Sequence, residues 1–172
     1  MSRFAIVVLH GWGLHGGIYN ELKKLLEKEG FKVFIPDLPG FGKESLRSSI
    51  MTLDDYIDFV DKFLKANAIV KPAIIGHSFG GRIALKYAFK YPQRANKIVL
   101  AGAPIIRSRV FKMKISFIVT IIGGQLFRFL PKATKDFLRK LLYFLIREWD
   151  YYNAGPLKQV LKNIISEDLV FY

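Results

Sequence analysis

One glycine-rich pentapeptide constrains the fold of this chain more than any other feature. Gly76-His77-Ser78-Phe79-Gly80, followed by Gly81, stands between a short apolar run at 73–75 and an amphipathic stretch. This context predicts a sharp strand-to-helix turn that presents the Ser78 hydroxyl in a strained backbone conformation. Gly76 and Gly80 leave room where side chains would collide, with His77 between them on the turn. The N–H of Phe79 begins the helix, where the dipole favours developing negative charge. The pattern indicates a nucleophilic serine.

A second glycine-rich loop follows the first apolar run of the chain. His10-Gly11-Trp12-Gly13 comes directly after residues 4–9, about 65 residues before Ser78. Small residues such as Gly11 and Gly13 allow a backbone to approach a substrate carbonyl closely, so we assign a second oxyanion donor to the N–H of Trp12. For His10 we expect a supporting role, in which its ring orients the loop by hydrogen bonds. The alternative is a catalytic base.

Apolar runs and amphipathic stretches alternate up to residue 104. The run at 4–9 predicts a buried strand, and the runs at 31–35, 72–76 and 97–102 predict further strands. The stretches between them predict helices, one carrying Ile18, Leu22, Leu25 and Leu26 on one face, one opened by a capping box of Thr52 and Asp55, and one over 79–90. The pattern predicts an α/β fold with a mostly parallel sheet and helices on both faces.

After Pro104 the pattern becomes helical. Residues 110–130, 134–148 and 156–166 predict helices with no strand between them. We therefore divide the chain into an α/β core at 1–104 and a helical cap at 105–172, with a free-standing helical tail as the alternative.

Composition narrows the possible classes. With no cysteine and three histidines, the 172-residue chain should hold neither a disulfide framework nor a thiolate or histidine-rich metal site, and no metal is expected. The formal charge of +13 predicts a basic surface, but no nucleic-acid module is visible. The absence of a signal peptide favours the cytoplasm. The apolar segment 115–130 is too short to span a bilayer, which leaves peripheral membrane contact as an alternative.

At these motifs the chain resembles the α/β-hydrolase superfamily, in its branch with a helical cap. The supporting strings are Leu9-His10-Gly11-Trp12-Gly13, Pro36-Asp37-Leu38-Pro39-Gly40-Phe41-Gly42, Gly76-His77-Ser78-Phe79-Gly80-Gly81 and Val99-Leu100-Ala101-Gly102-Ala103. The resemblance implies hydrolysis of a carboxylic ester or related acyl substrate through an acyl-enzyme on Ser78, without a cofactor. The first two strings are similar to the carboxylesterases that cleave pimeloyl-acyl-carrier-protein methyl ester, which implies a small-molecule acyl substrate that an acidic carrier protein could present.

The chain departs from the family pattern after the nucleophile. The family order is serine, acid, histidine, yet His10, His15 and His77 all precede Ser78. Three explanations remain open. The sequence is a fragment whose acid and histidine follow residue 172; the protein is a catalytically dead binding protein; or a base comes from His15 or a second subunit. The sheet is then expected to be incomplete at its C-terminal edge, and an exposed edge at 97–102 predicts low solubility or oligomers.

Overall fold

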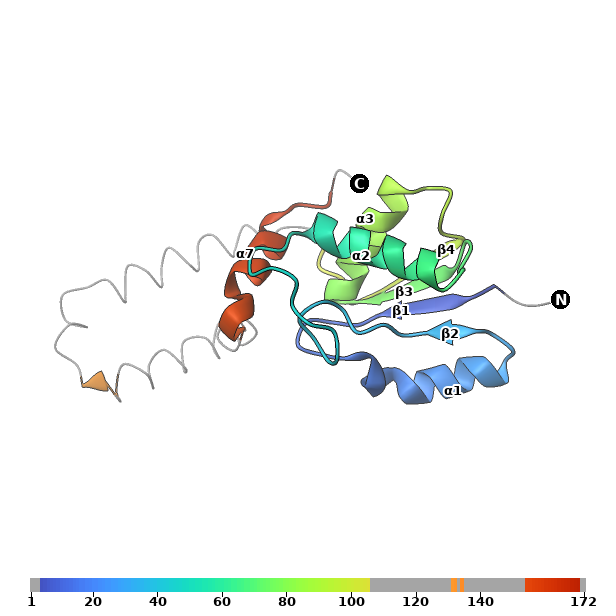
Figure 1. Ribbon diagram of the computed structural model, residues 1–172, viewed down its shortest axis with the longest axis horizontal. Coiled ribbons are helices and arrows are strands. Elements are labelled where there is room, and N and C mark those ends of the chain that lie inside the picture. The colour runs from blue at the N-terminus through green and yellow to red at the C-terminus, as the bar shows by residue number, and fades with distance from the viewer. Residues whose placement is uncertain (1–3, 106–130, 133, 135–153, 171–172) are drawn as a thin grey trace.

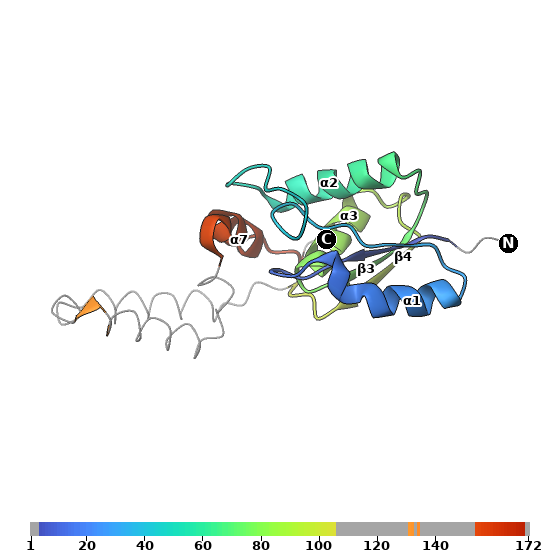
Figure 2. The same ribbon diagram turned by 60° about the horizontal axis from the view of Figure 1, so that its bottom comes forward.

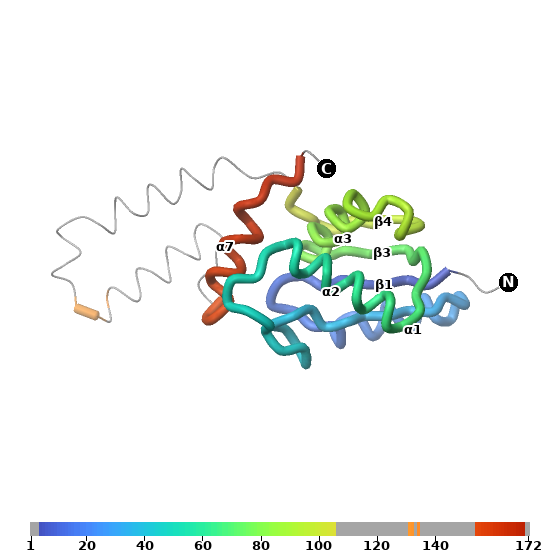
Figure 3. The backbone as a smooth tube through the Cα atoms, turned by 45° about the horizontal axis from the view of Figure 1, so that its top comes forward, coloured from blue at the N-terminus to red at the C-terminus, as the bar shows by residue number. Residues whose placement is uncertain are grey.

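Four parallel strands form the centre of the molecule. The structure, a computed structural model, describes residues 4–105, 131–132, 134 and 154–170 (Figure 1). The strands are β1 (Ile6–Leu9), β2 (Val33–Phe34), β3 (Ala73–His77) and β4 (Lys97–Ala101). They pair in the order β2-β1-β3-β4, and the tube in Figure 3 shows β1, β3 and β4 side by side. The predicted α/β fold with a parallel sheet is confirmed.

The helices of the described residues lie close to where the sequence predicted them. A 3₁₀ turn, η1 (Gly16–Tyr19), leads into α1 (Asn20–Lys28), and α2 (Leu53–Ala66) and α3 (Phe79–Lys90) follow. The Thr52 N–H donates a hydrogen bond to Oδ2 of Asp55 at 2.7 Å, so the expected reciprocal contact at the start of α2 is present. A second 3₁₀ turn, η3 (Gly155–Leu157), precedes α7 (Lys158–Ser166).

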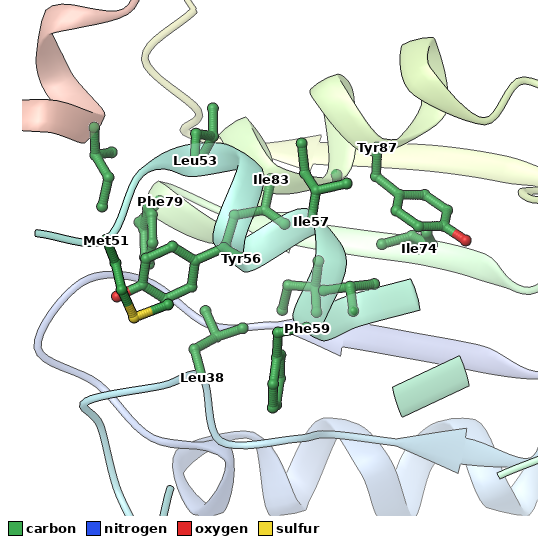
Figure 4. Close-up of a cluster of buried hydrophobic side chains, with 14 of the residues drawn as sticks. Leu38, Met51, Leu53, Tyr56, Ile57, Phe59, Ile74, Phe79, Ile83 and Tyr87 are labelled. Carbon is green, nitrogen blue, oxygen red and sulfur yellow. The ribbon is translucent and has the colours of Figure 1, made fainter. Parts of the chain in front are cut away.

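The sheet is covered on both faces because successive side chains of each strand point to opposite faces of the sheet. In β1, Val7 and Leu9 belong to the larger apolar cluster with α2 and α3, whereas Ile6 and Val8 belong to a smaller cluster on the α1 side. Figure 2 shows α1 on one face and both α2 and α3 on the other. The larger cluster, drawn in Figure 4, reaches the start of α3 through Phe79 and therefore supports the turn at Ser78.

The buried face of α1 is narrower than predicted. Leu22 and Leu26 pack against the sheet, but Leu25 is 60% exposed and Ile18 is 50% exposed. Ile18 falls in the 3₁₀ turn before the helix begins, and Leu25 lies beside the narrow i, i+4 stripe that 22 and 26 form. Of the four residues predicted at helical spacing, Ile18 therefore precedes the helix and Leu25 lies outside its buried stripe.

The β4 strand forms an exposed edge in the described part of the chain. It pairs with β3 along one side, from Lys97 to Ala101. Val99 is 51% exposed and Leu100 is 37% exposed, which is unusual for apolar residues of a parallel strand. Backbone groups and apolar side chains at such an edge are available for pairing.

The chain returns to the core at α7. Val160, Ile164 and Leu169 are buried in the larger cluster, and the Leu169 N–H donates to the Ile105 carbonyl at 3.3 Å. Figures 1 and 3 place α7 at the end of the sheet where the strands finish. The helices expected at 110–130 and 134–148, and with them most of the expected cap, lie outside the described residues. Among the helices that the structure describes, none is long and apolar enough to cross a membrane.

Candidate functional site

Ser78 occupies the turn between β3 and α3 in a conformation that L-amino acids rarely adopt. Its backbone has φ 49° and ψ −110°. The turn is held by the Ser78 N–H, which donates to the Ala101 carbonyl at 2.8 Å, and by the Ser78 carbonyl, which accepts from the Gly81 N–H at 3.0 Å. A non-glycine residue in such a region costs about 1–3 kcal/mol and persists only where its surroundings impose it. The strain therefore marks Ser78 as the candidate site.

The glycines beside Ser78 are required by close backbone contacts. A Cβ at Gly76 would lie 2.5 Å from the Gly80 carbonyl oxygen. A Cβ at Gly80 would lie well inside 3.0 Å of the Leu9 carbonyl oxygen at the end of β1. The Gly80 N–H donates to the His10 carbonyl at 3.1 Å. These contacts bring the Ser78 turn directly against the glycine-rich loop after β1.

The His10 side chain connects this loop to the loop after β2. The ring is fully buried; its Nδ1 is hydrogen-bonded to the Gly11 carbonyl at 2.8 Å, and its Nε2 accepts from the Leu38 N–H at 2.9 Å. Burial lowers the pKa of His10, and the Gly11 hydrogen bond only partly offsets this. Since Nε2 accepts, Nδ1 carries the proton, and both nitrogens of the neutral ring are occupied away from Ser78.

Trp12 and Phe79 stack together beside the turn. Their rings make a T-shaped contact, with 5.5 Å between centroids. Phe41 extends the cluster at 5.0 Å from the Trp12 ring, and Tyr56 extends it at 4.9 Å from the Phe79 ring. Figure 4 shows Tyr56 next to Phe79. In the described part of the chain, neither the Trp12 N–H nor the Phe79 N–H donates a hydrogen bond. The aromatic packing fixes the two backbone segments that carry these donors.

The remaining histidines, His77 and His15, make their hydrogen bonds to residues other than Ser78. His77 Nδ1 is hydrogen-bonded to the Tyr19 hydroxyl at 2.8 Å, and a Cβ at Gly11 would lie 3.0 Å from the same nitrogen. His15 Nδ1 accepts from the Gly17 N–H at 3.2 Å. Gly13, the last residue of the loop, has φ 71°. His10 is hydrogen-bonded elsewhere as well, so no hydrogen bond joins a histidine to the Ser78 hydroxyl among the described residues.

Asp37 is a structural residue of the site that sequence reasoning did not single out. Its Oδ1 accepts from the Gly16 N–H at 2.7 Å, and its Oδ2 accepts from the Lys43 N–H at 2.8 Å. Partial burial raises the pKa of this carboxyl, but the two backbone donors outweigh burial and the pKa lies below its usual value. The carboxylate stabilises the loop beside His10. The sequence feature that could have identified Asp37 was its position in the glycine- and proline-rich string 36–42.

Residues from α7 border the same region. The Asn163 Nδ2 donates to the Ile50 carbonyl at 3.0 Å, and a Cβ at Gly40 would lie 2.9 Å from a methyl of Leu157.

Among the described residues, no group of three His, Cys, Asp or Glu side chains could hold a metal ion. The described site combines a strained serine with the aromatic cluster of Trp12, Phe41, Tyr56 and Phe79.

The fold and this turn agree with the comparison to known families. A family model described as the alpha/beta hydrolase fold matches residues 5–131, so the chain belongs to the α/β-hydrolase family. The resemblance inferred from the motifs is confirmed.

Individual relatives share this family. Pimeloyl-[acyl-carrier protein] methyl ester esterase of Shewanella woodyi is 34% identical over 60% of this chain and 38% of its own length. The protein of the same name from Wigglesworthia glossinidia brevipalpis is 26% identical over 97% of this chain and 69% of its own. The crystal structure of Paleococcus ferrophilus monoacylglycerol lipase superimposes with a TM-score of 0.58 at 26% identity, over 69% of this chain and 47% of that one. The chain spans about half the length or less of several curated relatives that it matches.

Proposed function

We propose that this chain carries the nucleophile and oxyanion donors of a serine hydrolase that acts on carboxylic esters. Ser78 attacks the substrate carbonyl to form an acyl-enzyme, and the N–H groups of Trp12 and Phe79 donate to the oxyanion. The strained backbone of Ser78, at φ 49° and ψ −110°, carries the proposal, because strain of this kind persists only where the surroundings impose it and is concentrated at active sites. The relatives whose names specify a methyl ester esterase and a monoacylglycerol lipase support an ester as substrate.

The proposed chemistry needs a base, and none of the histidine hydrogen bonds in the described part of the chain is made to Ser78. Loss of a triad member lowers the rate by several orders of magnitude, while an oxyanion hole retains part of the acceleration. We therefore expect the 172-residue chain to react slowly and propose that full activity needs a histidine and an acid from outside it. A small acyl substrate presented by an acidic carrier protein fits the net charge of +13.

Reaction with a fluorophosphonate probe tests the nucleophile. Mass spectrometry should locate a slowly formed adduct on the peptide that contains Ser78, and Ser78→Ala should remove it. Ser48→Ala is the matched control, because Ser48 is an exposed loop serine whose Oγ accepts from the Ile50 N–H. An adduct shared evenly among surface serines would reject Ser78 as the nucleophile.

A non-catalytic binding protein is the second candidate. The observation that favours it is the absence of a base near the Ser78 hydroxyl among the described residues. If the probe leaves Ser78 unmodified while p-nitrophenyl esters of rising acyl length bind without turnover, this candidate replaces the hydrolase.

A further inference from the structure

Arg82 is a buried cation whose hydrogen bonds connect three distant parts of the chain. Only 4% of its surface is exposed, although arginine is rarely buried without strong partners. Its Nη1 donates to the Pro104 carbonyl, and its Nη2 donates to the Ile164 carbonyl at 3.0 Å and to the Glu167 carbonyl at 2.5 Å. A single guanidinium thus holds the chain where it leaves the sheet after β4 and where it returns at the end of α7.

One of the carbonyls that Arg82 binds belongs to the C-terminal end of a helix. The last four carbonyls of a helix have no intrahelical donor, and those of α7 include Ile164. The Ser166 hydroxyl satisfies the Asn163 carbonyl at 2.8 Å, and Arg82 satisfies Ile164. Because α7 has no basic residue in its own last turn, the positive charge that favours a helix C-terminus comes from α3.

Arg82 is also connected to the candidate nucleophile. It lies in the first turn of α3, where its N–H donates to the Ser78 carbonyl at 3.3 Å. One turn further along α3, the Lys86 ammonium lies 2.6 Å from the Glu167 carboxylate and adds an ion pair to the contact between α3 and the end of α7. The segment after β4 and the segment after α7 also contact each other directly, because the Leu169 N–H donates to the Ile105 carbonyl. The positions of both segments are therefore set relative to α3, the helix that follows Ser78.

We infer that Arg82 is a positioning residue, a clasp that holds Pro104 beside Ile164 and Glu167 and thereby fixes α7 over the carboxyl end of the sheet. The fork of an arginine suits this task, because it directs donors to several carbonyls at once. A lysine would keep the charge but would not span all three acceptors. The inference goes beyond the hydrolytic chemistry and holds whether or not Ser78 reacts.

Amide hydrogen exchange on the full chain tests the clasp. In Arg82→Met, we expect the amides of α7 and Leu169 to exchange at least about tenfold faster, since tenfold corresponds to only about 1.4 kcal/mol of local opening. Amides of β1 and β3 should keep their protection. Arg82→Lys should fall between the wild type and Arg82→Met.

The matched control is Lys90→Met, which removes another α3 cation that pairs with Asp54 and Asp58 on α2. It should leave α7 exchange unchanged. The inference is overturned if Arg82→Met accelerates β1, β3 and α7 equally, since Arg82 would then serve only general stability. It is also overturned if α7 does not respond, or if Arg82→Lys matches the wild type. Should Arg82→Met fail to fold, the regional pattern in Arg82→Lys decides the question.

Discussion

Replacing Gly80 by alanine tests whether backbone contact really locks the Ser78 turn against the loop after β1. In an ordinary helix, glycine to alanine stabilises by about 1 kcal/mol. Here the new Cβ would fall well inside 3.0 Å of the Leu9 carbonyl oxygen and also against the His10 carbonyl. Both are backbone atoms at the end of a central strand, so they cannot rotate away as a side chain can.

The magnitude follows from the same contacts. Overpacking of this kind costs about 3 kcal/mol, and separating the segments also weakens the Gly80 N–H bond to the His10 carbonyl, worth about 1 kcal/mol. After the helix-propensity gain is set against these losses, we expect a net decrease of about 3 kcal/mol in the free energy of unfolding. For a chain of this size that corresponds to a fall in Tm of about 6–12 °C.

Urea unfolding followed by circular dichroism measures the change. The neighbouring Gly81→Ala is the matched control, because its severe clash would be with the Ala103 side chain, while the nearest strand backbone atom, the Gly76 carbonyl oxygen, would lie 3.0 Å away. Adding Ala103→Gly to that variant should recover most of the stability lost at Gly81, whereas no side-chain change can relieve Gly80→Ala. A Gly80→Ala protein that is as stable as the wild type would refute the reasoning.

Three further results are expected. Ser78→Gly should be more stable than Ser78→Ala by about 1–2 kcal/mol in urea unfolding, because both lack the hydroxyl and only alanine keeps the strain at φ 49° and ψ −110°. At Ser166, the last residue of α7, alanine should instead be the more stable, by at most about 1 kcal/mol, and glycine being clearly more stable at both sites would contradict the strain. Because burial lowers the pKa of His10, the unfolded state takes up a proton at higher pH than the folded state. The free energy of unfolding should therefore fall as pH drops below about 6.5, by at most about 1.4 kcal/mol per pH unit. His10→Gln should flatten this pH dependence, and an unchanged slope would mean that another group causes it. In size-exclusion chromatography the wild type should elute as oligomers through the β4 edge and Val99→Lys should shift it toward monomer, whereas Val70→Lys, at a more exposed position outside the sheet, should not; a sharp wild-type monomer peak would argue against edge pairing.

Local signals in the sequence were sufficient for most elements. The capping box at Thr52 and the glycine-serine turn before Phe79 each depend on residues within one or two turns of one another, and the bounds of α3 were predicted correctly. Steric demand at the turn is equally local, since Gly76 contacts the backbone of residues 80 and 81. Short-range physics of this kind can be read directly from neighbouring residue types.

Contacts between elements that are distant in the sequence could not be predicted from neighbouring residue types. Nothing in the sequence near Asp37 indicates that its two oxygens accept from Gly16 and Lys43, because those amides depend on how η1 and the loop after β2 pack together. The exposure of Leu25 likewise depends on how much of α1 the sheet can cover, a quantity that helical periodicity alone does not fix.

The amino-acid sequence by itself determined the kind of elements, their order and the strained serine that defines the site. Tertiary structure alone decided that Arg82 closes a gap between residues 104 and 164–167, and that His10 is held from both nitrogens. The physical reason is range: backbone conformation responds to neighbours a few residues away. The partners of a buried polar group are chosen when elements from different parts of the chain pack and exclude water.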